Sequence, residues 1–353
     1  MNDRLLNLTG QLSAHHLDAY LVTEDTNIRY LTRFPASESW LLVGHGNAVY
    51  LTDFRYVLEA RKGLKNIPVF QYSTSLPEAV FARARLRRAR RIGFDERHVS
   101  LATFRRLKAA CPASVRLVAA NGLVEKLREI KEKGEIEQVR QALKIQQQAL
   151  RYLKGIIRPG VSEAAVCSSL EQYVKARRVG FSFDPIIASG PNSSLPHAKP
   201  TARRFGRNEI VLVDFGIDVK GYKSDLTRIF ILGKIPQLVR EIFTAVEVAQ
   251  RKAIAKIKAG VKASEVDFEA RNYLKSKKLS QFFGHSLGHG VGLQIHEDPR
   301  LSSKSPAVLK ENMIVTVEPA VYLPNKFGIR IEDMVLVNKA GCEVLSEHID
   351  HGC

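Results

Sequence analysis

An internal repeat constrains the fold of this chain more than any other feature of its sequence. The positions that recur one hundred residues later are Gly160 and Gly260, Val161 and Val261, Val166 and Val266, Tyr173 and Tyr273, and Lys175 and Lys275. Each copy is followed by a His-x-x-Pro element, at residues 197–200 and 296–299. A repeat of this kind indicates two related structural units within one chain. We therefore expect two halves that meet face to face.

Each half carries a pair of acidic residues beside strand-like segments. In the first half, Asp214 closes the apolar run 210–213, and Asp225 opens the run that ends at Leu232. Glycines at 216 and 221 lie between them, which is typical of a hairpin. In the second half, Glu318 follows the run 315–317 and Glu332 lies within 329–335. Cross-strand neighbours approach to about 5 Å, so paired carboxylates can share one cation.

His289 is the fifth candidate ligand. It lies in residues 284–292, where four glycines in nine positions argue against a helix and for backbone packed closely around a site. Four carboxylates facing one centre would repel strongly in a low-dielectric interior unless cations compensated them. The pattern thus predicts two divalent ions held by Asp214, Asp225, His289, Glu318 and Glu332. One imidazole among oxygen ligands favours manganese, cobalt or iron over a structural zinc.

The length of 353 residues favours two domains. Residues 1–125 alternate helix-like and strand-like segments, with a hairpin turn at 45–47, and predict an α/β module of mixed sheet without a catalytic constellation. Residues 126–353 predict an α+β domain in which helices pack on one face of a sheet. Its first helix is expected to run to residues 158–160 and its second to begin near Ser162, with the same helix pair again across 238–279.

The formal net charge of +18 raises the possibility of a nucleic-acid partner. The one dense basic cluster comprises Arg83, Arg85, Arg87, Arg88, Arg90 and Arg91. We interpret this cluster as a solvated helix end that runs into a strand, because no aromatic residues alternate with the arginines as single-strand binding requires. Nucleic-acid binding is therefore not expected.

Cysteine usage and the absence of long apolar runs bear on the compartment. The cysteines Cys111, Cys167, Cys342 and Cys353 show no Cys-x-x-Cys spacing, so a disulfide framework is not expected. No segment approaches eighteen uninterrupted apolar residues, and the first residues carry no apolar leader. These features predict a cytoplasmic protein with no membrane-spanning segment.

Six ordered motifs resemble those of the pita-bread metallopeptidases, the family of methionine aminopeptidase, prolidase and aminopeptidase P. The motifs lie at residues 211–216, 224–228, 288–292, 296–299, 317–319 and 328–333. The resemblance covers essentially the whole chain. It implies a pita-bread catalytic domain with an internal pseudo-twofold repeat at 126–353, and residues 1–125 resemble the creatinase-type N-terminal domain of prolidases and aminopeptidases P.

The resemblance also implies roles for individual residues. The five candidate ligands would hold two metal ions, with Asp225 and Glu332 bridging them. The ions would activate a water molecule and polarise the scissile carbonyl. Glu318 would transfer the proton, and His285 and His296 would stabilise the substrate carbonyl and the oxyanion. His197 would contact the substrate. Tyr322 and Arg330 would either bind substrate or orient Glu318 or Glu332.

The resulting prediction is an Xaa-Pro aminopeptidase with two manganese ions, acting as a homodimer on peptides whose second residue is proline. One alternative is a prolidase, which cleaves only Xaa-Pro dipeptides. A non-catalytic pita-bread protein that binds RNA and a metal-free creatine-type amidinohydrolase are disfavoured, because all five ligand positions are retained. Ser286, Asp298 and Ala320 depart from the common family pattern and leave the choice of substrate open.

Overall fold

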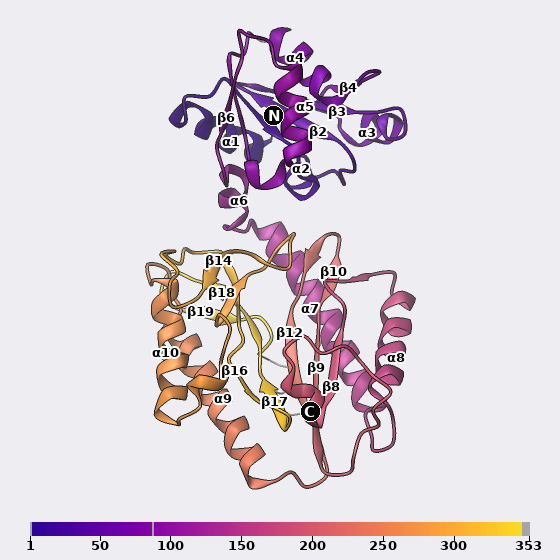
Figure 1. Cartoon of the computed structure of the whole chain (residues 1–353), viewed down its shortest axis with the longest axis vertical. Helices are drawn as coiled ribbons and strands as arrows, with labels where there is room; N and C mark the ends of the chain where they lie inside the picture. The colour runs from indigo at the N-terminus through magenta and orange to yellow at the C-terminus, as the bar shows by residue number, and fades with distance from the viewer. Residues whose placement is uncertain (1, 87, 348–353) are drawn as a thin grey trace. The chain divides into compact units, whose positions relative to one another are not determined.

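The computed structural model describes residues 2–86 and 88–347 of the chain. It divides into two compact units, residues 1–128 and 129–353, which are considered separately below (Figure 1). The division falls at the end of a short helix, α6 (Leu123–Arg128), within which the boundary expected from the sequence at 125/126 also lies.

The first unit is built on a six-stranded mixed sheet with the order β4-β3-β2-β1-β5-β6. Its strands are β1 (Ala19–Val22), β2 (Trp40–Gly44), β3 (Asn47–Thr52), β4 (Val69–Gln71), β5 (Arg91–Phe94) and β6 (Arg116–Ala119). Its other helices are α1 (Asp3–Ala14), α2 (Asp25–Thr32), α3 (Val57–Gly63), α4 (Leu76–Leu86) and α5 (Leu101–Ala110), with a 3-10 turn at Glu96–His98. The β1–β2 and β2–β3 pairs are antiparallel, and the β1–β5, β3–β4 and β5–β6 pairs are parallel.

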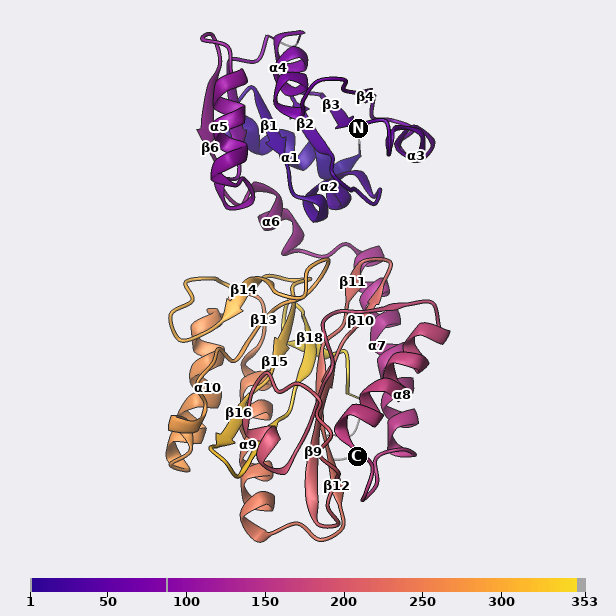
Figure 2. The same cartoon turned by 45° about the vertical axis from the view of Figure 1, so that its right-hand side comes forward.

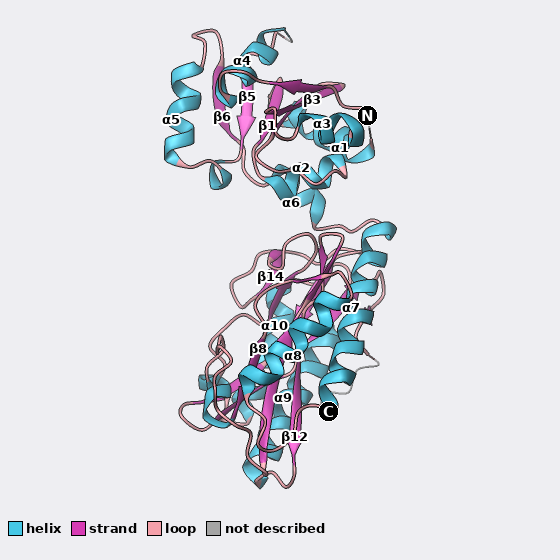
Figure 3. Ribbon diagram, turned by 90° about the vertical axis from the view of Figure 1, so that its right-hand side faces the viewer, coloured by secondary structure: helices cyan, strands magenta, loops and turns pink. Residues whose placement is uncertain are grey.

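Helices cover both faces of this sheet. α4 and α5 pack on one face through residues such as Val80, Ala84 and Leu107, whereas α1 and α2 contact β2 from the other side (Figure 3). The hairpin expected at 45–47 is confirmed, because Gly44 pairs with Asn47 around a two-residue loop. Strand β6 was not predicted, since it is a half-exposed edge strand with no clear alternation of apolar and polar residues.

The arginine cluster occupies the end of α4 and the start of β5, as the sequence suggested. Within it, Arg83 lies over the ring of Phe70 at 3.5 Å, and Arg91 donates from Nε to the carbonyl oxygen of His16 at 2.7 Å. Arg87 lies outside the described residues. At least these two arginines are therefore engaged with the first unit itself.

The second unit places two helix pairs on either side of a group of strands (Figures 1 and 2). The expectation that helices pack on one face only is therefore wrong, because each half of the repeat brings its own helix pair. The helices are α7 (Lys133–Lys154), α8 (Glu163–Ala176), α9 (Gln237–Lys256) and α10 (Ala263–Ser276), with 3-10 turns at Gly190–Ser194 and Ser280–Phe282. The strands of the first half are β7 (Gly180–Phe181), β8 (Ile186–Ser189), β9 (Glu209–Phe215), β10 (Ile217–Val219), β11 (Tyr222–Lys223) and β12 (Leu226–Leu232). Those of the second half are β13 (Gly288–Gly290), β14 (Glu297–Leu301), β15 (Ile314–Val317), β16 (Ala320–Leu323), β17 (Phe327–Arg330), β18 (Asp333–Val337) and β19 (Cys342–Val344).

The repeat seen in the sequence is a structural repeat. Helices α8 and α10 begin and end one hundred residues apart, and each follows a glycine in the left-handed region, Gly160 at φ +88° and Gly260 at φ +90°. Val166 and Val266 occupy equivalent, fully buried positions. The repeated glycines therefore mark the turn before each helix, and the repeated valines mark its buried face.

The first helix of the unit is shorter than expected. α7 ends at Lys154 with Gly155 as its C-cap, rather than at residues 158–160. The N–H groups of Ile156 and Ile157 both donate to the carbonyl oxygen of Leu153 at 2.9 Å, and Ile157 packs in the same core as Leu153, so the chain leaves the helix before the proline.

The central strands are buried on both faces. Along β9, Val211, Val213 and Phe215 pack with α7 and α8, whereas Ile210 and Leu212 belong to the core that contains α9 and α10. A strand buried on both faces reads as a continuous apolar run. This arrangement explains the uninterrupted run before Asp214 and gives that residue a rigid support.

Two further sequence expectations concern the cysteines and membrane-spanning segments. Cys111, Cys167 and Cys342 are free thiols, and Cys353 lies outside the described residues. Among the residues that the structure describes, no helix combines the length and hydrophobicity needed to cross a bilayer.

The left-handed glycine before α10 gives a test of the turn. Substitution Gly260→Ala meets no steric obstacle within 4 Å, so its effect should come from the positive φ alone. We expect a loss of about 1 kcal/mol in the free energy of unfolding. In the control Gly134→Ala, at an equally open helical position of α7, stability should be unchanged or should rise. Urea denaturation followed by circular dichroism measures both, and equal effects would contradict the role given to the turn.

Candidate metal centre

The paired strands of the first half position Asp214 and Asp225. β9 and β12 are antiparallel, with Asp214 opposite Thr227, so Asp225 lies two residues before the position that faces Asp214. Asp225 is held at the start of β12 by its backbone N–H, which points to Sδ of Met334 at 3.2 Å. Both aspartates are buried, at 6% and 4% exposure.

The second half presents its acids in a different register. β15 and β18 end their ladder at the pair Val317 and Asp333, so Glu318 and Glu332 directly follow and precede that pair and lie opposite each other. The two pairs of acids are therefore not superimposable copies. The first half offers short side chains in a diagonal relation, and the second half offers long side chains that face each other.

His289 lies in the middle of β13, between two glycines. A Cβ atom at Gly288 would come within 2.0 Å of the carbonyl oxygen of Thr316, so only glycine allows β13 to lie this close to β15. The close backbone packing expected for this segment is thus present. Nδ1 of His289 lies 3.0 Å from the carbonyl oxygen of Gly290, which assigns the proton to Nδ1. Nε2 is then left as the lone-pair nitrogen that a metal requires.

The imidazole brings the acids of both halves together. Nε2 of His289 lies 3.3 Å from Oε1 of Glu318 and 3.7 Å from Oδ2 of Asp225. Ligand atoms of Asp225, His289 and Glu332 all lie within 4.8 Å of one another. Residues separated by more than one hundred positions thus form one cluster.

Burial and mutual repulsion dominate the electrostatics of this cluster. Burial, followed by the charges of Glu332 and Asp214, raises the pKa of Asp225 well above its usual range. Burial and the neighbouring charges of Glu318 and Asp214 likewise raise the pKa of Glu332. Burial would also raise the pKa of Glu318, but the neighbouring imidazoles of His289 and His285 and the guanidinium of Arg330 together lower it. The centre as a whole therefore requires positive charge.

Arg330 supplies part of that charge. Its Nη2 donates to Oδ2 of Asp214, its Nη1 to the hydroxyl of Tyr322 at 2.5 Å, and its Nε to Oγ1 of Thr227 at 3.0 Å. Burial raises the pKa of Asp214, against the opposing effect of this guanidinium. Arg330 is 4% exposed, and its hydrogen bonds are to other residues of the protein. It therefore orients Asp214.

Two threonines of the centre were not singled out from the sequence. Oγ1 of Thr227 donates to Oε2 of Glu332 at 2.8 Å, and Oγ1 of Thr316 donates to Oε1 of Glu318 at 3.3 Å. Each hydroxyl fixes the orientation of a glutamate carboxylate. Strand alternation could have found them, because Thr227 shares a face with Asp225 two residues away, and Thr316 shares one with Glu318.

The remaining histidines lie around the carboxylates. The ring of His296 packs edge-on against that of His289, with the ring centroids 4.3 Å apart. His296 also lies within electrostatic range of His197. Nε2 of His285 lies 3.5 Å from the hydroxyl of Tyr322, whereas its Nδ1 faces the carbonyl oxygen of Ser286. Burial lowers the pKa of both His285 and His296, which favours their neutral forms. The structure thus gathers the predicted site residues around one centre.

The donor set fits divalent metal ions. Oδ1 of Asp214 is buried and accepts no hydrogen bond from the described part of the chain. Four carboxylates and one lone-pair imidazole nitrogen match the ligand types that hard and intermediate cations take. An acidic, buried and convergent group of this kind defines a metal-dependent hydrolase centre.

Family models place the chain within a known group. Residues 137–339 match metallopeptidase family M24, and residues 4–130 match the creatinase/prolidase N-terminal domain. The chain belongs to metallopeptidase family M24. Membership of this family implies a dinuclear metal site. The predicted pita-bread catalytic domain and creatinase-type N-terminal domain are confirmed.

Individual relatives align over nearly the full length. The chain is 36% identical to the uncharacterized peptidase YqhT of Bacillus subtilis, over 96% of this chain and 95% of the relative. It is similar to the structure of an Xaa-Pro dipeptidase from Bacillus anthracis, with 34% identity, a TM-score of 0.94 and coverage of 98% and 97%. It is also similar to that of an X-Pro aminopeptidase from Thermotoga maritima, with 33% identity, a TM-score of 0.89 and the same coverage.

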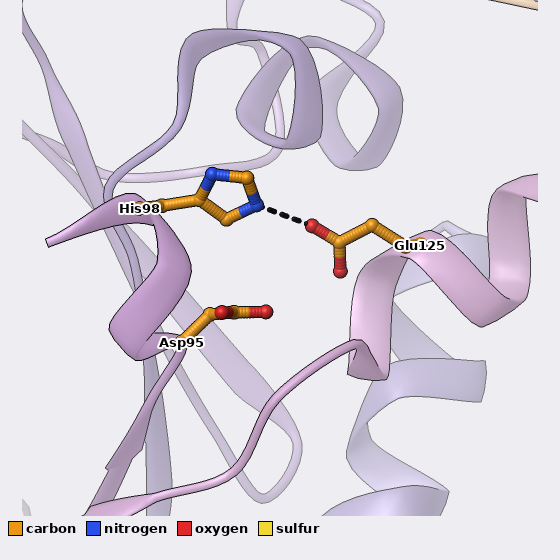
Figure 4. A group of neighbouring side chains, drawn as sticks. All are labelled: Asp95, His98 and Glu125. Carbon is orange, nitrogen blue, oxygen red and sulfur yellow. Dashed lines mark hydrogen bonds and ion pairs between the residues drawn. The ribbon is translucent and has the colours of Figure 1, made fainter. Parts of the chain in front are cut away.

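A second group of ligand-type side chains lies within the first unit (Figure 4). Nε2 of His98 and Oε1 of Glu125 are 2.6 Å apart, with Asp95 beside them. The guanidinium of Arg97 forms two hydrogen bonds from Nε and Nη2 to Asp95, at 2.9 and 2.6 Å, and lies 3.4 Å from Glu125. Because an arginine already compensates both carboxylates, we interpret this group as an ion-pair network that joins α6 to the segment after β5.

The network should make the stability of the first unit depend on pH. The hydrogen bond from His98 to Glu125 raises the pKa of His98 in the folded unit. Its stabilisation is fully present below the unfolded value of about 6.5 and is lost as pH rises through the raised value. We expect His98→Gln to lower the free energy of unfolding by about 1 kcal/mol near pH 5.5 and by less near pH 9.

Trp40, the single tryptophan, lies in β2, so its fluorescence reports on the unfolding of this unit. The exposed His15, at the end of α1, provides the control His15→Gln. Equal pH dependence in the two variants would show that the pair does not contribute.

Proposed function

We propose that this protein is an Xaa-Pro aminopeptidase, which hydrolyses the bond between an N-terminal residue and a proline in the second position. The observation that carries the proposal is the convergence of Asp214, Asp225, His289, Glu318 and Glu332 on one buried centre. The relatives support this substrate class, because their names divide between Xaa-Pro aminopeptidase and Xaa-Pro dipeptidase. The prolidase activity remains the alternative.

The proposed metal is manganese. Four of the five ligands are carboxylates and only one is an imidazole, and carboxylate oxygens suit manganese, whereas structural zinc prefers cysteine and histidine. Two divalent ions, when bound, would supply an activated water and a polarised scissile carbonyl. Asp225 and Glu332 would bridge the ions, as the family resemblance implies, and their ligand atoms lie within 4.8 Å of each other and of one of His289.

Glu318 is the proposed general base and acid. Its side chain is 16% exposed, which makes it accessible to water, and its lowered pKa keeps the carboxylate ready to accept a proton. The proton would pass to the nitrogen of the departing proline. Thr316 and His289 restrain the carboxylate while this transfer takes place.

The histidines are proposed to act on the substrate carbonyl. Nδ1 of His285 is occupied by the carbonyl oxygen of Ser286, so only Nε2 is left to face the substrate, beside Tyr322. His296 and His197 lie on the exposed side of the centre, where a peptide can reach them. These positions support a role in holding the carbonyl and the tetrahedral oxyanion.

Arg330 and Tyr322 are proposed to position the centre. Both were expected to bind substrate or to orient a ligand, and their contacts favour orientation, because Arg330 bonds to Asp214 and Tyr322 bonds to Arg330. Nη1 of Arg330 also donates to the carbonyl oxygen of Pro196, next to His197. Arg330 thus joins a ligand to the segment that carries a proposed substrate contact.

The ligand assignment can be tested with a single substitution. Asp225→Asn keeps the size of the side chain but removes the negative charge between the two halves, so metal binding and turnover should fall by at least a thousandfold while the fold is kept. Asp218→Asn, which affects a nearby surface ion pair with Lys223, is the control and should retain activity. Full turnover in the Asp225 variant would make the assignment wrong.

Substrate length separates the two candidate activities. We expect metal-stripped protein, reloaded with Mn²⁺, to cleave an Xaa-Pro-Yaa tripeptide amide and to lose this activity again when chelated. Cleavage of an Xaa-Pro dipeptide alone would instead make the protein a prolidase. If neither peptide is cleaved with Mn²⁺, Co²⁺ or Zn²⁺, the Xaa-Pro specificity is wrong.

A further inference from the structure

A fully buried glutamine, Gln250, interrupts the apolar face of α9. Its neighbours on that face are Val246, Ala249 and Ala253, and all four side chains are 0% exposed. An amide among methyl groups destabilises the core unless its polar atoms find hydrogen-bond partners. The partners of this amide show what it does.

The side-chain amide donates to two backbone carbonyls. Nε2 of Gln250 lies 3.0 Å from the carbonyl oxygen of Val317 and 3.3 Å from that of Ile331. These oxygens belong to the peptide groups whose nitrogens are those of Glu318 and Glu332. One amide therefore joins the two peptide groups that lead directly into two proposed metal ligands.

Each of these peptide groups is also held at its other end. The N–H of Glu318 donates to the carbonyl oxygen of Leu287 at 2.8 Å, and the N–H of Glu332 donates to that of Thr227 at 3.3 Å. Because a peptide group is planar, bonds at both ends fix its orientation. The direction in which each glutamate side chain leaves the backbone is fixed with it.

Gln250 acts at a short interruption in the strand pairing. The ladder between β15 and β18 ends at Val317 and Asp333, just before the two glutamates. Pairing of the same two segments resumes at Ala320 and Arg330 in β16 and β17, and a backbone bond of 3.5 Å from the N–H of Ile331 to the carbonyl oxygen of Pro319 lies in the gap. The two hydrogen bonds from Gln250 span the strands at this point.

We propose that Gln250 is a positioning residue of the metal centre, which sets the separation of Glu318 and Glu332 without touching metal or substrate. This inference rests on the proposed metal centre. It assigns a function to a buried residue of α9 whose Nε2 has two partners and whose Oε1 accepts no hydrogen bond from the described part of the chain.

The chain contains a matched control. Gln146 on α7 is also 0% exposed, and its Nε2 donates to the carbonyl oxygen of Phe215. That oxygen belongs to the peptide group between residues 215 and 216, which carries the nitrogen of no proposed ligand. Loss of the Gln146 amide should therefore disturb the core to a similar extent but leave the metal ligands in place.

The test compares Gln250→Met with Gln146→Met in the full-length chain. Methionine keeps the length of the side chain and removes the donor. After metal removal, we expect the melting temperatures of both variants to fall by similar amounts. In calorimetric titrations with Mn²⁺, Gln250→Met should bind at least tenfold more weakly than the parent protein, and Gln146→Met should remain within threefold of it. Visible absorption of the Co²⁺-loaded proteins should change for Gln250→Met only.

Equal loss of affinity in the two variants, or parent-like affinity in Gln250→Met, would overturn the proposal. If Gln250→Met does not fold, Gln250→Glu carries the test, because a neutral carboxylic acid keeps the shape and one donor. It should bind Mn²⁺ more weakly than the parent, and parent-like affinity would contradict the proposal. A parent protein that binds no Mn²⁺ would overturn both the metal centre and this role, whereas failure of the positioning role alone leaves the parent's binding intact.

Discussion

Repulsion among four carboxylates, three of them buried, is the constraint on which the catalytic unit depends. Asp214, Asp225, Glu318 and Glu332 are brought together from two halves of the chain and largely removed from water, so each raises the cost of ionising the others. The surrounding structure opposes this cost at fixed points. Arg330 neutralises Asp214, and Thr227 donates to Glu332. Divalent ions would supply the remaining charge.

Buried arginines also hold the backbone of the centre. The guanidinium of Arg228 is fully buried, donates to the carbonyl oxygen of Glu332 at 2.5 Å and forms an ion pair with Asp333 at 2.7 Å. Asp333 in turn accepts from Ser346 at 2.6 Å. Breaking a buried pair of this kind leaves an uncompensated charge and is strongly destabilising. The strand that presents Glu332 is therefore fixed independently of the carboxylate itself.

The repeat, the two helix pairs and the five proposed ligands could be predicted from the sequence, because each is marked by a pattern of neighbouring residues. Gly160 and Gly260 mark turns that require positive φ, and the acids follow apolar runs that end at predictable places. The role of Gln250 and the partners of Arg330 could not be predicted in this way. A glutamine in a helix looks like any solvent-exposed polar residue until the facing strands are known, and an arginine near a pocket can bind either substrate or protein. These contacts depend on residues 67 and 116 positions away, which a single sequence does not specify.

The two halves keep their likeness at the periphery and lose it at the centre. Helices α8 and α10 and the glycine turns before them recur at a spacing of one hundred residues, whereas the acids differ in length, register and partners. A peptide has a direction, with an amino end and a carboxyl end that an enzyme must distinguish. A perfectly twofold cleft would accept such a chain equally well in both orientations. The divergence of the duplicated halves thus makes the two ends of the cleft different. An exopeptidase needs this difference to bind a peptide in one orientation and to cleave it at a fixed distance from one end.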